Sequence, residues 1–440
     1  MIYKYRQLGV EMVCYLIPSL KKGECYKLNK KRNLALGIIC LVIVTSVITF
    51  AISATVFLGW NKLNPEYVIH FNPQDVKIDS INKFNKVRDT LERNFYESVD
   101  ENKLLEGAVA GMADSLGDIY TVYYTKEQMQ KLMEISSKSE EVYTGIGVNV
   151  IMENDGLVTI VEAFEGSPAQ KAGIMSGDKI IKVNGEDVTG IRDQDIIINM
   201  IKGPENTNVI VTVYRPSEAR SIDFDLKLEK IKYVINIRSE IMDGKIGYIR
   251  IASFNDKNIN HIFREELNKL LAKKIKGLII DVRDNPGGYY GEVVRIADRL
   301  LPEGLIVYTE DKNKNKHVEN SDKTELGLPM ALLTNGNSAS ASEVLAGAIK
   351  DHKKGVLIGT RTFGKGLVQD IYPLDDGSGI KVTIARYYTP SGICIHGIGI
   401  EPDIEVKLND KYKNVPISQV LRGDDEQLQT ALEVLRAKTK

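Results

Sequence analysis

A serine and a lysine in the C-terminal half of the chain have the types and spacing that covalent catalysis requires. Ser340 lies at an expected strand-to-helix turn, where backbone N–H groups are unpaired. Lys365 follows 25 residues later between Gly364 and Gly366, which allow another backbone to come close. A serine hydroxyl becomes a nucleophile when a neighbouring base takes its proton, and lysine can be that base when burial lowers its pKa from about 10.4. The pair predicts a serine–lysine dyad.

The same residues also have a purely structural interpretation. The run Ser-Ala-Ser-Ala-Ser at 338–342 is an acceptable N-cap sequence for a helix, and Gly-Lys-Gly at 364–366 can be an ordinary turn. Spacing alone leaves both interpretations open.

The elements that position the pair follow from hydrophobic patterning. We expect a strand at Met330–Thr334, a small-residue turn at 335–342, a helix at 343–351 and a second strand at 356–360. Residues 277–283 form a continuous apolar strand, which is typical of a sheet covered on both faces. This alternation predicts an α/β fold for the C-terminal half.

Several separated motifs around the pair resemble the signature of the carboxyl-terminal processing peptidases (tail-specific proteases). They are the string 337–343, the string 362–366 and Gln369, and the resemblance extends over roughly residues 80 to 440. It implies that Ser340 is the nucleophile, that Lys365 is the general base and that Gln369 orients Lys365. It also implies a protease core of the ClpP/crotonase-like type.

The Asn-Pro-Gly-Gly turn at 285–288 follows the strand at 277–283 and can be read as an ordinary tight turn. In the carboxyl-terminal processing peptidases, which this sequence resembles, the turn supplies one N–H group that binds the oxyanion. The residue after the nucleophile supplies the other. The resemblance therefore assigns these roles to Gly287 (or Gly288) and to Ala341.

Residues 142–230 have a different character from the rest. A glycine-rich turn enters a strand, and short strands, tight turns and a helix at 196–201 follow, as in any small β-rich domain. The pattern resembles a PDZ domain of the circularly permuted kind. The resemblance implies that the 145–148 loop donates N–H groups to the carboxylate of a peptide that adds as a strand. The residues implied in substrate binding are Gly145, Ile146, Gly147, Val148 and Lys202.

The N-terminal part of the chain contains an uncharged run of 25 residues at 34–58, preceded by a lysine- and arginine-rich segment. A helix of that length spans ~37 Å, against a hydrocarbon core of ~30 Å, so we expect a transmembrane anchor with the N-terminus inside. A cleaved signal peptide is the alternative, although its apolar region would normally be only ~7–15 residues long.

Further helices are expected from apolar residues at three- and four-residue spacing. They cover 81–95, 101–116 and 125–136 in a region that we expect to pack as a helical subdomain, and 424–438 at the C-terminus. The family resemblance adds that the N-terminal helical region helps the protein to dimerise. The polar run 310–324 is expected to be a surface excursion.

A chain of 440 residues is too long for one ordinary domain. We divide it into a basic cytoplasmic segment at 1–33, a transmembrane anchor at 34–58, a linker at 59–79, an N-terminal helical region at 80–141, a PDZ domain at 142–230, a serine protease core at 231–410 and a C-terminal helical region at 411–440.

Other chemistries lack their signatures. The net charge is −1, which gives no reason to expect nucleic acid. The five histidines do not form a HExxH motif, and the sequence contains neither a Gly-x-Ser-x-Gly elbow nor a phosphate-binding loop. Asp281, Asp284 and Glu343 are interpreted as strand-end and first-turn acids rather than as a catalytic pair. No metal or nucleotide cofactor is expected.

These features predict a membrane-anchored serine endopeptidase, active as a homodimer outside the cytoplasm, that recognises substrate C-termini through a PDZ domain. Two alternatives remain open. The chain could be a catalytically silent PDZ scaffold, although a scaffold has no need of both Ser340 and Lys365. It could also be a signalling protease that cuts one dedicated partner, for example in sporulation.

Overall fold

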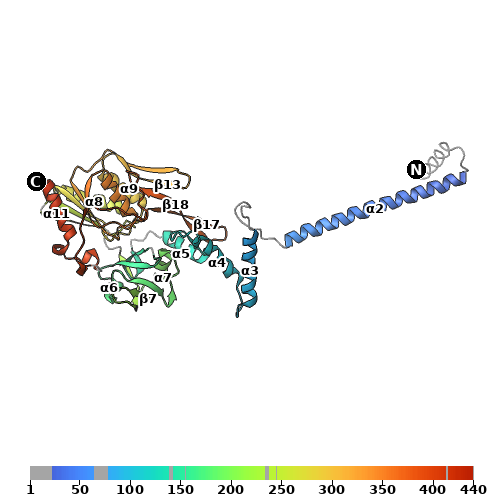
Figure 1. The fold of residues 1–440 in the computed structure, drawn as a ribbon, viewed down its shortest axis with the longest axis horizontal. Coiled ribbons are helices and arrows are strands. Elements are labelled where there is room, and N and C mark those ends of the chain that lie inside the picture. The colour runs from blue at the N-terminus through green and yellow to red at the C-terminus, as the bar shows by residue number, and fades with distance from the viewer. Residues whose placement is uncertain are drawn as a thin grey trace. The chain divides into compact units, whose positions relative to one another are not determined.

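The computed structural model describes residues 22–63, 78–137, 142–153, 155–232, 237–243, 245–412 and 415–439. The expected basic segment up to residue 21 and most of the expected linker, 64–77, lie outside the described residues. Residues 1–99 and 100–440 form two compact units, and each is described by itself. The order of the elements can be followed by colour in Figure 1.

The described residues of the first unit form the helices α2 (Lys22–Leu63) and α3 (Ile78–Asn94). Within α2, the segment Asn33–Thr55 is long and apolar enough to cross a membrane by length and composition, and none of it is buried. The expected periodic helix is confirmed as α3, but Phe84, Val87 and Leu91 are exposed rather than packed in a core.

The second unit begins with α4 (Glu101–Asp114), whose N-terminus is capped by the Asp100 carboxylate, followed by β1 (Val122–Tyr124) and α5 (Lys126–Ser137). The expectation that the apolar face of α4 packs in a core is wrong for this chain. Only Ala113 of α4 is buried, whereas Leu105 and Met112 are 51% and 66% exposed. The helix contacts β1, yet Leu105, Val109 and Met112 of its apolar stripe are exposed.

A β-rich domain follows, built on an antiparallel sheet in the order β3-β4-β5-β7-β8, with β6 beside β5. The strands are β3 (Val148–Met152), β4 (Val158–Ala163), β5 (Lys179–Val183), β6 (Glu186–Asp187), β7 (Asn208–Arg215) and β8 (Arg220–Lys227). The helices are α6 (Pro168–Ala172) and α7 (Gln194–Ile201), and β2 (Val142–Gly145) pairs with β9 (Glu229–Lys232). β3 is at one end of this sheet, and among the described residues no strand pairs with its outer edge.

The C-terminal part contains the expected α/β sheet in the order β10-β11-β12-β15-β16-β19, parallel from β11 onward. The strands are β10 (Ile237–Met242), β11 (Ile246–Ile251), β12 (Gly277–Asp281), β15 (Met330–Thr334), β16 (Gly355–Gly359) and β19 (Ile404–Glu405). The helices are α8 (Ile259–Ala272), α9 (Tyr290–Leu300), α10 (Ala341–Asp351) and α11 (Glu426–Thr439).

Both faces of this sheet are buried, as the continuous apolar strand at 277–283 predicts. Leu278 and Ile280 pack with α8, α9 and α10 in the largest hydrophobic cluster. Ile279, which points to the opposite face, packs with α11. The carboxyl ends of β12 and β15 therefore lie side by side and carry the two loops that form the site.

A second sheet, in the order β1-β18-β13-β14 with β17 also on β18, connects to this core. Its remaining strands are β13 (Gly304–Asp311), β14 (Lys316–Ser321), β17 (Leu367–Pro373) and β18 (Gly379–Tyr388). The polar run 310–324 lies mostly at the surface, as expected, and contains β14 and the turn that joins it to its partner β13. Short 3₁₀ turns at Asp410–Tyr412, Ile417–Gln419 and Arg422–Asp424 lead into α11.

Candidate active site

Ser340 lies at the junction between β15 and α10, where its backbone adopts an unusual conformation. It is the N-cap of α10, with φ 54° and ψ −113°. A positive φ is strained for a residue other than glycine and persists only where surrounding contacts enforce it. Two hydrogen bonds tie the turn to the segment that follows β12. Ser338 Oγ donates to the Val282 carbonyl at 2.7 Å, and Ala339 N donates to the Asn285 carbonyl at 3.0 Å.

The buried carboxylate of Glu343 connects the serine turn to the lysine loop. It accepts hydrogen bonds from Ser340 N at 2.9 Å, Thr362 Oγ1 at 2.6 Å, Gly364 N at 2.7 Å and Lys365 N at 2.7 Å. Burial raises the pKa of Glu343, while these four hydrogen bonds oppose the rise. The interpretation of Glu343 as an ordinary first-turn acid therefore missed its role. The signal was its place three residues after an N-cap serine, as in a capping box.

Lys365 has the environment that a lysine base requires. Burial lowers the pKa of its ammonium, and the nearby Lys381 lowers it further, while Asp195, Asp193 and Glu343 act in the opposite direction. Its Nζ lies 4.6 Å from the centroid of the Tyr120 ring. Tyr120 was not singled out as a site residue, because it comes from the turn before β1, 245 residues earlier in the chain.

Gln369 lies on β17, and its Nε2 donates to Thr383 Oγ1 on β18 at 3.3 Å. Within the described part of the chain no hydrogen bond joins Gln369 to Lys365, so the orienting contact that the family resemblance implies stays a prediction. Gln369 and Thr383 are also paired in the β17–β18 register. The amide is therefore fixed to the wall of the site beside the lysine.

The glycine turn after β12 lies directly against Ser340. A Cβ atom on Gly287 would come within 2.9 Å of Ser340 Cβ, and one on Gly288 within 2.1 Å of the Phe254 backbone. Only glycine fits such close approaches. The Gly287 N–H donates to Asn285 Oδ1 at 2.9 Å, so it is engaged inside its own turn. Gly288 therefore becomes the better candidate for an oxyanion donor beside Ala341, the first residue of α10.

The 145–148 loop is shaped by its second glycine. Gly147 has φ 76°, and a Cβ atom there would lie 2.5 Å from Ser167 Cβ. The loop is tied to α6, since the Ile146 carbonyl accepts from Ala169 N at 3.0 Å. Lys202, directly after α7, has its pKa lowered by burial, and Asp195 counteracts this.

One cavity of about 530 Å³ joins the two groups of predicted residues. Its wall includes Ser340, Lys365 and Gln369 together with Gly287 and Gly288. It also includes the whole 145–148 loop and Lys202, so every predicted site residue except Ala341 lines it. Asp195, Ile198 and Ile201 of α7 and Val150 of β3 complete the groove between this helix and the sheet edge.

The β-rich domain also touches the loops that carry the reactive residues. Ile151 and Val161 pack against Ala339 and Phe363, which flank the serine and lysine loops. Polar contacts lie on either side: the Arg250 guanidinium binds the Glu162 carboxylate at 3.2 Å, and the Lys381 ammonium pairs with Asp193 at the N-cap of α7.

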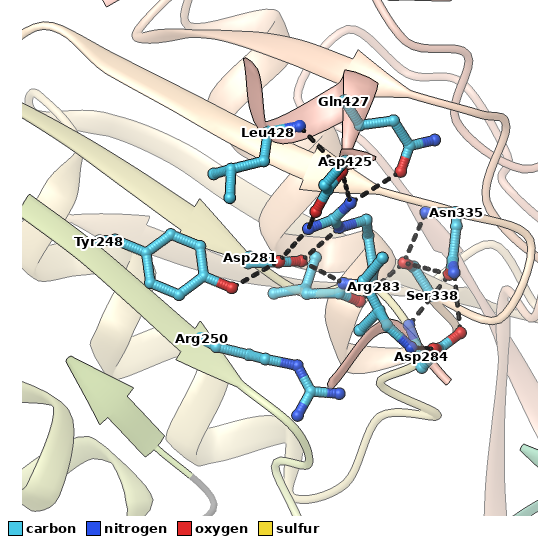
Figure 2. A network of polar contacts seen from close by, with 12 residues as sticks. Tyr248, Arg250, Asp281, Arg283, Asp284, Asn335, Ser338, Asp425, Gln427 and Leu428 are labelled. Atoms are coloured by element: carbon cyan, nitrogen blue, oxygen red, sulfur yellow. Dashed lines mark hydrogen bonds and ion pairs between the residues drawn. The ribbon is translucent and has the colours of Figure 1, made fainter. Parts of the chain in front are cut away.

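A buried polar network supports the serine turn from the side of β12 (Figure 2). Arg283, only 1% exposed, donates to Asp281, Asp425 and Gln427. Next to it, the Asp284 carboxylate accepts from Asn335 Nδ2 at 2.8 Å and from Asn337 Nδ2 at 2.9 Å. Sequence reasoning placed the acids at the strand end but missed Arg283, whose position between two aspartates was the available signal.

The model of peptidase family S41 matches residues 245–406, that of a PDZ domain matches 159–215, and that of the activating protease CtpB N-terminal domain matches 53–128. A carboxy-terminal-processing protease of Bartonella bacilliformis is 33% identical over 380 residues, which cover 83% of this chain and 84% of that protein. Carboxy-terminal processing protease CtpB of Bacillus subtilis is 36% identical over 342 residues, covering 77% and 70%.

A solved structure, the photosystem II D1 C-terminal processing protease, superposes with a TM-score of 0.62 at 29% identity. The match covers 80% of this chain and 90% of that one. The α/β core and the PDZ domain predicted from the sequence are therefore confirmed.

Proposed function

Since this chain belongs to the carboxy-terminal processing proteases of peptidase family S41, we propose that it cuts proteins whose free C-termini its PDZ domain has bound, with Ser340 and Lys365 as the reacting pair. The chain is a serine-type C-terminal processing peptidase by that membership. The observation that carries the finer proposal is the single cavity lined by the 145–148 loop and by both reacting residues.

In the proposed reaction Ser340 Oγ attacks a peptide carbonyl carbon while Lys365 Nζ takes the hydroxyl proton. The carbonyl oxygen becomes negative and is bound by N–H groups of Ala341 and of Gly288 or Gly287. When the C–N bond breaks, Lys365 returns the proton to the leaving amine. Water then hydrolyses the ester on Ser340 by the same proton transfers. The lowered pKa of Lys365 supports this role, because a base must be neutral to accept a proton.

Tail capture is proposed for the other end of the cavity. The peptide adds as a strand along the free edge of β3, and its carboxylate meets the N–H groups of the 145–148 loop with Lys202 nearby. Val150, Ile198 and Ile201 offer an apolar surface to the last side chains. An unfolded C-terminus with apolar end residues is therefore the proposed substrate class.

The anchor and the assembly are further parts of the proposal. The apolar segment of α2 holds the enzyme in the membrane, with residues 1–33 inside the cell and the catalytic part outside. The exposed apolar stripe of α4 supports a homodimer formed through the helical region. The domain boundaries given from the sequence are retained in this scheme.

A dedicated signalling protease remains the second candidate, because residues 53–128 match the N-terminal domain of an activating protease. A silent scaffold is disfavoured by the presence of both Ser340 and Lys365 in the cavity.

The test uses the full chain in detergent and an unfolded protein with a free apolar C-terminus. We expect the wild type to cut it, and Ser340→Ala and Lys365→Ala to lose at least about a thousandfold in kcat/KM, as removal of a nucleophile or base does. The matched control Lys323→Ala, whose side chain is 83% exposed, should retain activity. Amidation of the substrate C-terminus should abolish capture. Tight binding without cleavage by the wild type would instead favour the scaffold.

A further inference from the structure

The Tyr120 ring lies against the Lys365 ammonium. Lys365 Nζ lies 4.6 Å from the ring centroid, within the range in which an aromatic face attracts a cation. Burial raises the pKa of the Tyr120 phenol to about 12, with Asp118 and Glu343 adding to the rise. The ring is therefore a neutral partner at every pH at which a protease would be assayed.

The 118–121 turn that carries this ring is held by its own hydrogen bonds. The Asp118 carboxylate accepts from Tyr120 N at 3.1 Å and from Thr121 Oγ1 at 2.8 Å. Thr121 Oγ1 in turn accepts from Thr383 N at 3.1 Å. Because Gln369 donates to the same Thr383, the ring and the amide share one support on β18. The hydrogen bonds of the 118–121 turn therefore fix the backbone that carries the Tyr120 ring.

Charged groups surround Lys365 from several elements. Lys381 on β18 repels its ammonium, while Asp193 at the N-cap of α7, Asp195 on α7 and Glu343 on α10 attract it. The ring face adds a further attraction that acts only on the charged lysine, because a neutral amine gains no cation–π stabilisation. A general base must be neutral, so this contact opposes the catalytic form.

We propose that Tyr120 is a positioning residue that holds Lys365 charged in the peptide-free enzyme, and that the lysine leaves the ring when it acts as the base on Ser340. This inference rests on the proposed role of Lys365. It gives the ring a defined function: it sets the pH at which the free enzyme acquires its base.

Kinetics can separate this role from a structural one, since the pH profile of kcat/KM reports groups in the free enzyme and that of kcat reports groups in the substrate complex. The experiment measures both profiles for the full chain in detergent, with one unfolded free-tail substrate. Replacing the ring by Tyr120→Leu or Tyr120→Met should move the rising limb of kcat/KM about one pH unit lower. Tyr120→Phe, which keeps an aromatic face, should leave that limb in place. The rising limb of the pH profile of kcat should move much less than that of kcat/KM in every variant.

Three results would overturn the inference. The first is an unmoved kcat/KM limb in the leucine and methionine variants, and the second is an equal shift in Tyr120→Phe. The third is an equal shift in kcat, which would mean that the lysine stays on the ring in the substrate complex. Two non-aromatic variants are used so that misfolding of one, detected by thermal unfolding, leaves the test intact. Lys365→Ala distinguishes the two levels: if it retains activity, the proposed function fails, whatever the Tyr120 profiles show.

Discussion

At the scale of single residues, Glu343 connects the two loops that carry the proposed reacting pair. One buried carboxylate accepts from the backbone of Ser340 and from the backbone of Lys365, so it fixes the distance between the two loops. Ser340 has a strained, positive φ, and the hydrogen bond that its N–H donates to the Glu343 carboxylate stabilises that conformation.

Glu343→Gln tests this function of the carboxylate. A glutamine keeps the size but replaces one acceptor oxygen with an NH₂ group, which would face backbone donors. Loss of one or two charge-assisted hydrogen bonds, at roughly 1.5–3 kcal/mol each, should lower kcat about 10- to 100-fold or more, with a small change in KM. Steady-state kinetics measures kcat and KM of this variant. The control is Glu433→Gln, because Glu433 is an exposed residue on α11. Equal kcat in the two variants would show that Glu343 does not position the pair.

Ser340 and Lys365 were singled out from the sequence by local motifs and by the family resemblance, and their role as a dyad stays a prediction. The contacts of the two loops that carry them could not be predicted. The contact of Lys365 with Tyr120 and that of Gln369 with Thr383 depend on how β18 pairs with β1 and β17. The β1–β18 pairing joins distant parts of the chain, and the register of the β17–β18 hairpin includes an irregularity at Val368/Gln369, so neither contact follows from a local pattern.

At the scale of elements, the serine turn rests on the carboxyl end of β12. Arg283 is surrounded by Asp281 and Asp425, so one buried cation compensates two buried carboxylates. The network also links β12 to the segment before α11, because Asp425 precedes that helix (Figure 2). The active-site loops and the C-terminal helix are thus stabilised by a shared set of charges.

Removal of the central cation should be costly. Arg283→Met leaves Asp281 and Asp425 buried without a counter-charge, and breaking a buried pair in this way typically costs about 3–5 kcal/mol. Urea unfolding should reveal a loss of that order in the free energy of unfolding. The control Arg295→Met removes an exposed ion pair with Glu292 and should change stability by less than about 1 kcal/mol. A comparable effect of the two substitutions would contradict the role given to the network.

The elements themselves were largely predictable, because strands such as β12 and β15 are continuous apolar runs and the helices repeat apolar residues at helical spacing. The sequence was less informative about which apolar residues are buried. The stripe of α4 has the periodicity of a core helix, yet Leu105 and Met112 remain exposed in the single chain. The polar run 310–324 forms β14 because backbone pairing with β13 does not require apolar side chains.

At the scale of the whole molecule, the proposed function requires that binding of a substrate C-terminus to the PDZ domain be coupled to the reaction at Ser340. Within residues 100–440 the PDZ domain contacts the serine and lysine loops through Ile151 and Val161. The 145–148 loop and α7 line the same cavity as Ser340. A substrate tail bound there, as proposed, would lie within reach of the groups that hold Ser340 and Lys365, so its binding is expected to change the reactivity of Ser340.

The most direct measurement of this claim is the rate at which a fluorophosphonate labels the full chain in detergent, with the modified residue identified by mass spectrometry. The account predicts labelling at Ser340, at least several-fold faster when a peptide with a free apolar C-terminus is present, with no acceleration by the amidated peptide. It also predicts that Lys365→Ala is labelled far more slowly. Labelling of a different serine, or equal rates for Ser340 with the free peptide, with the amidated peptide and in Lys365→Ala, would contradict the account.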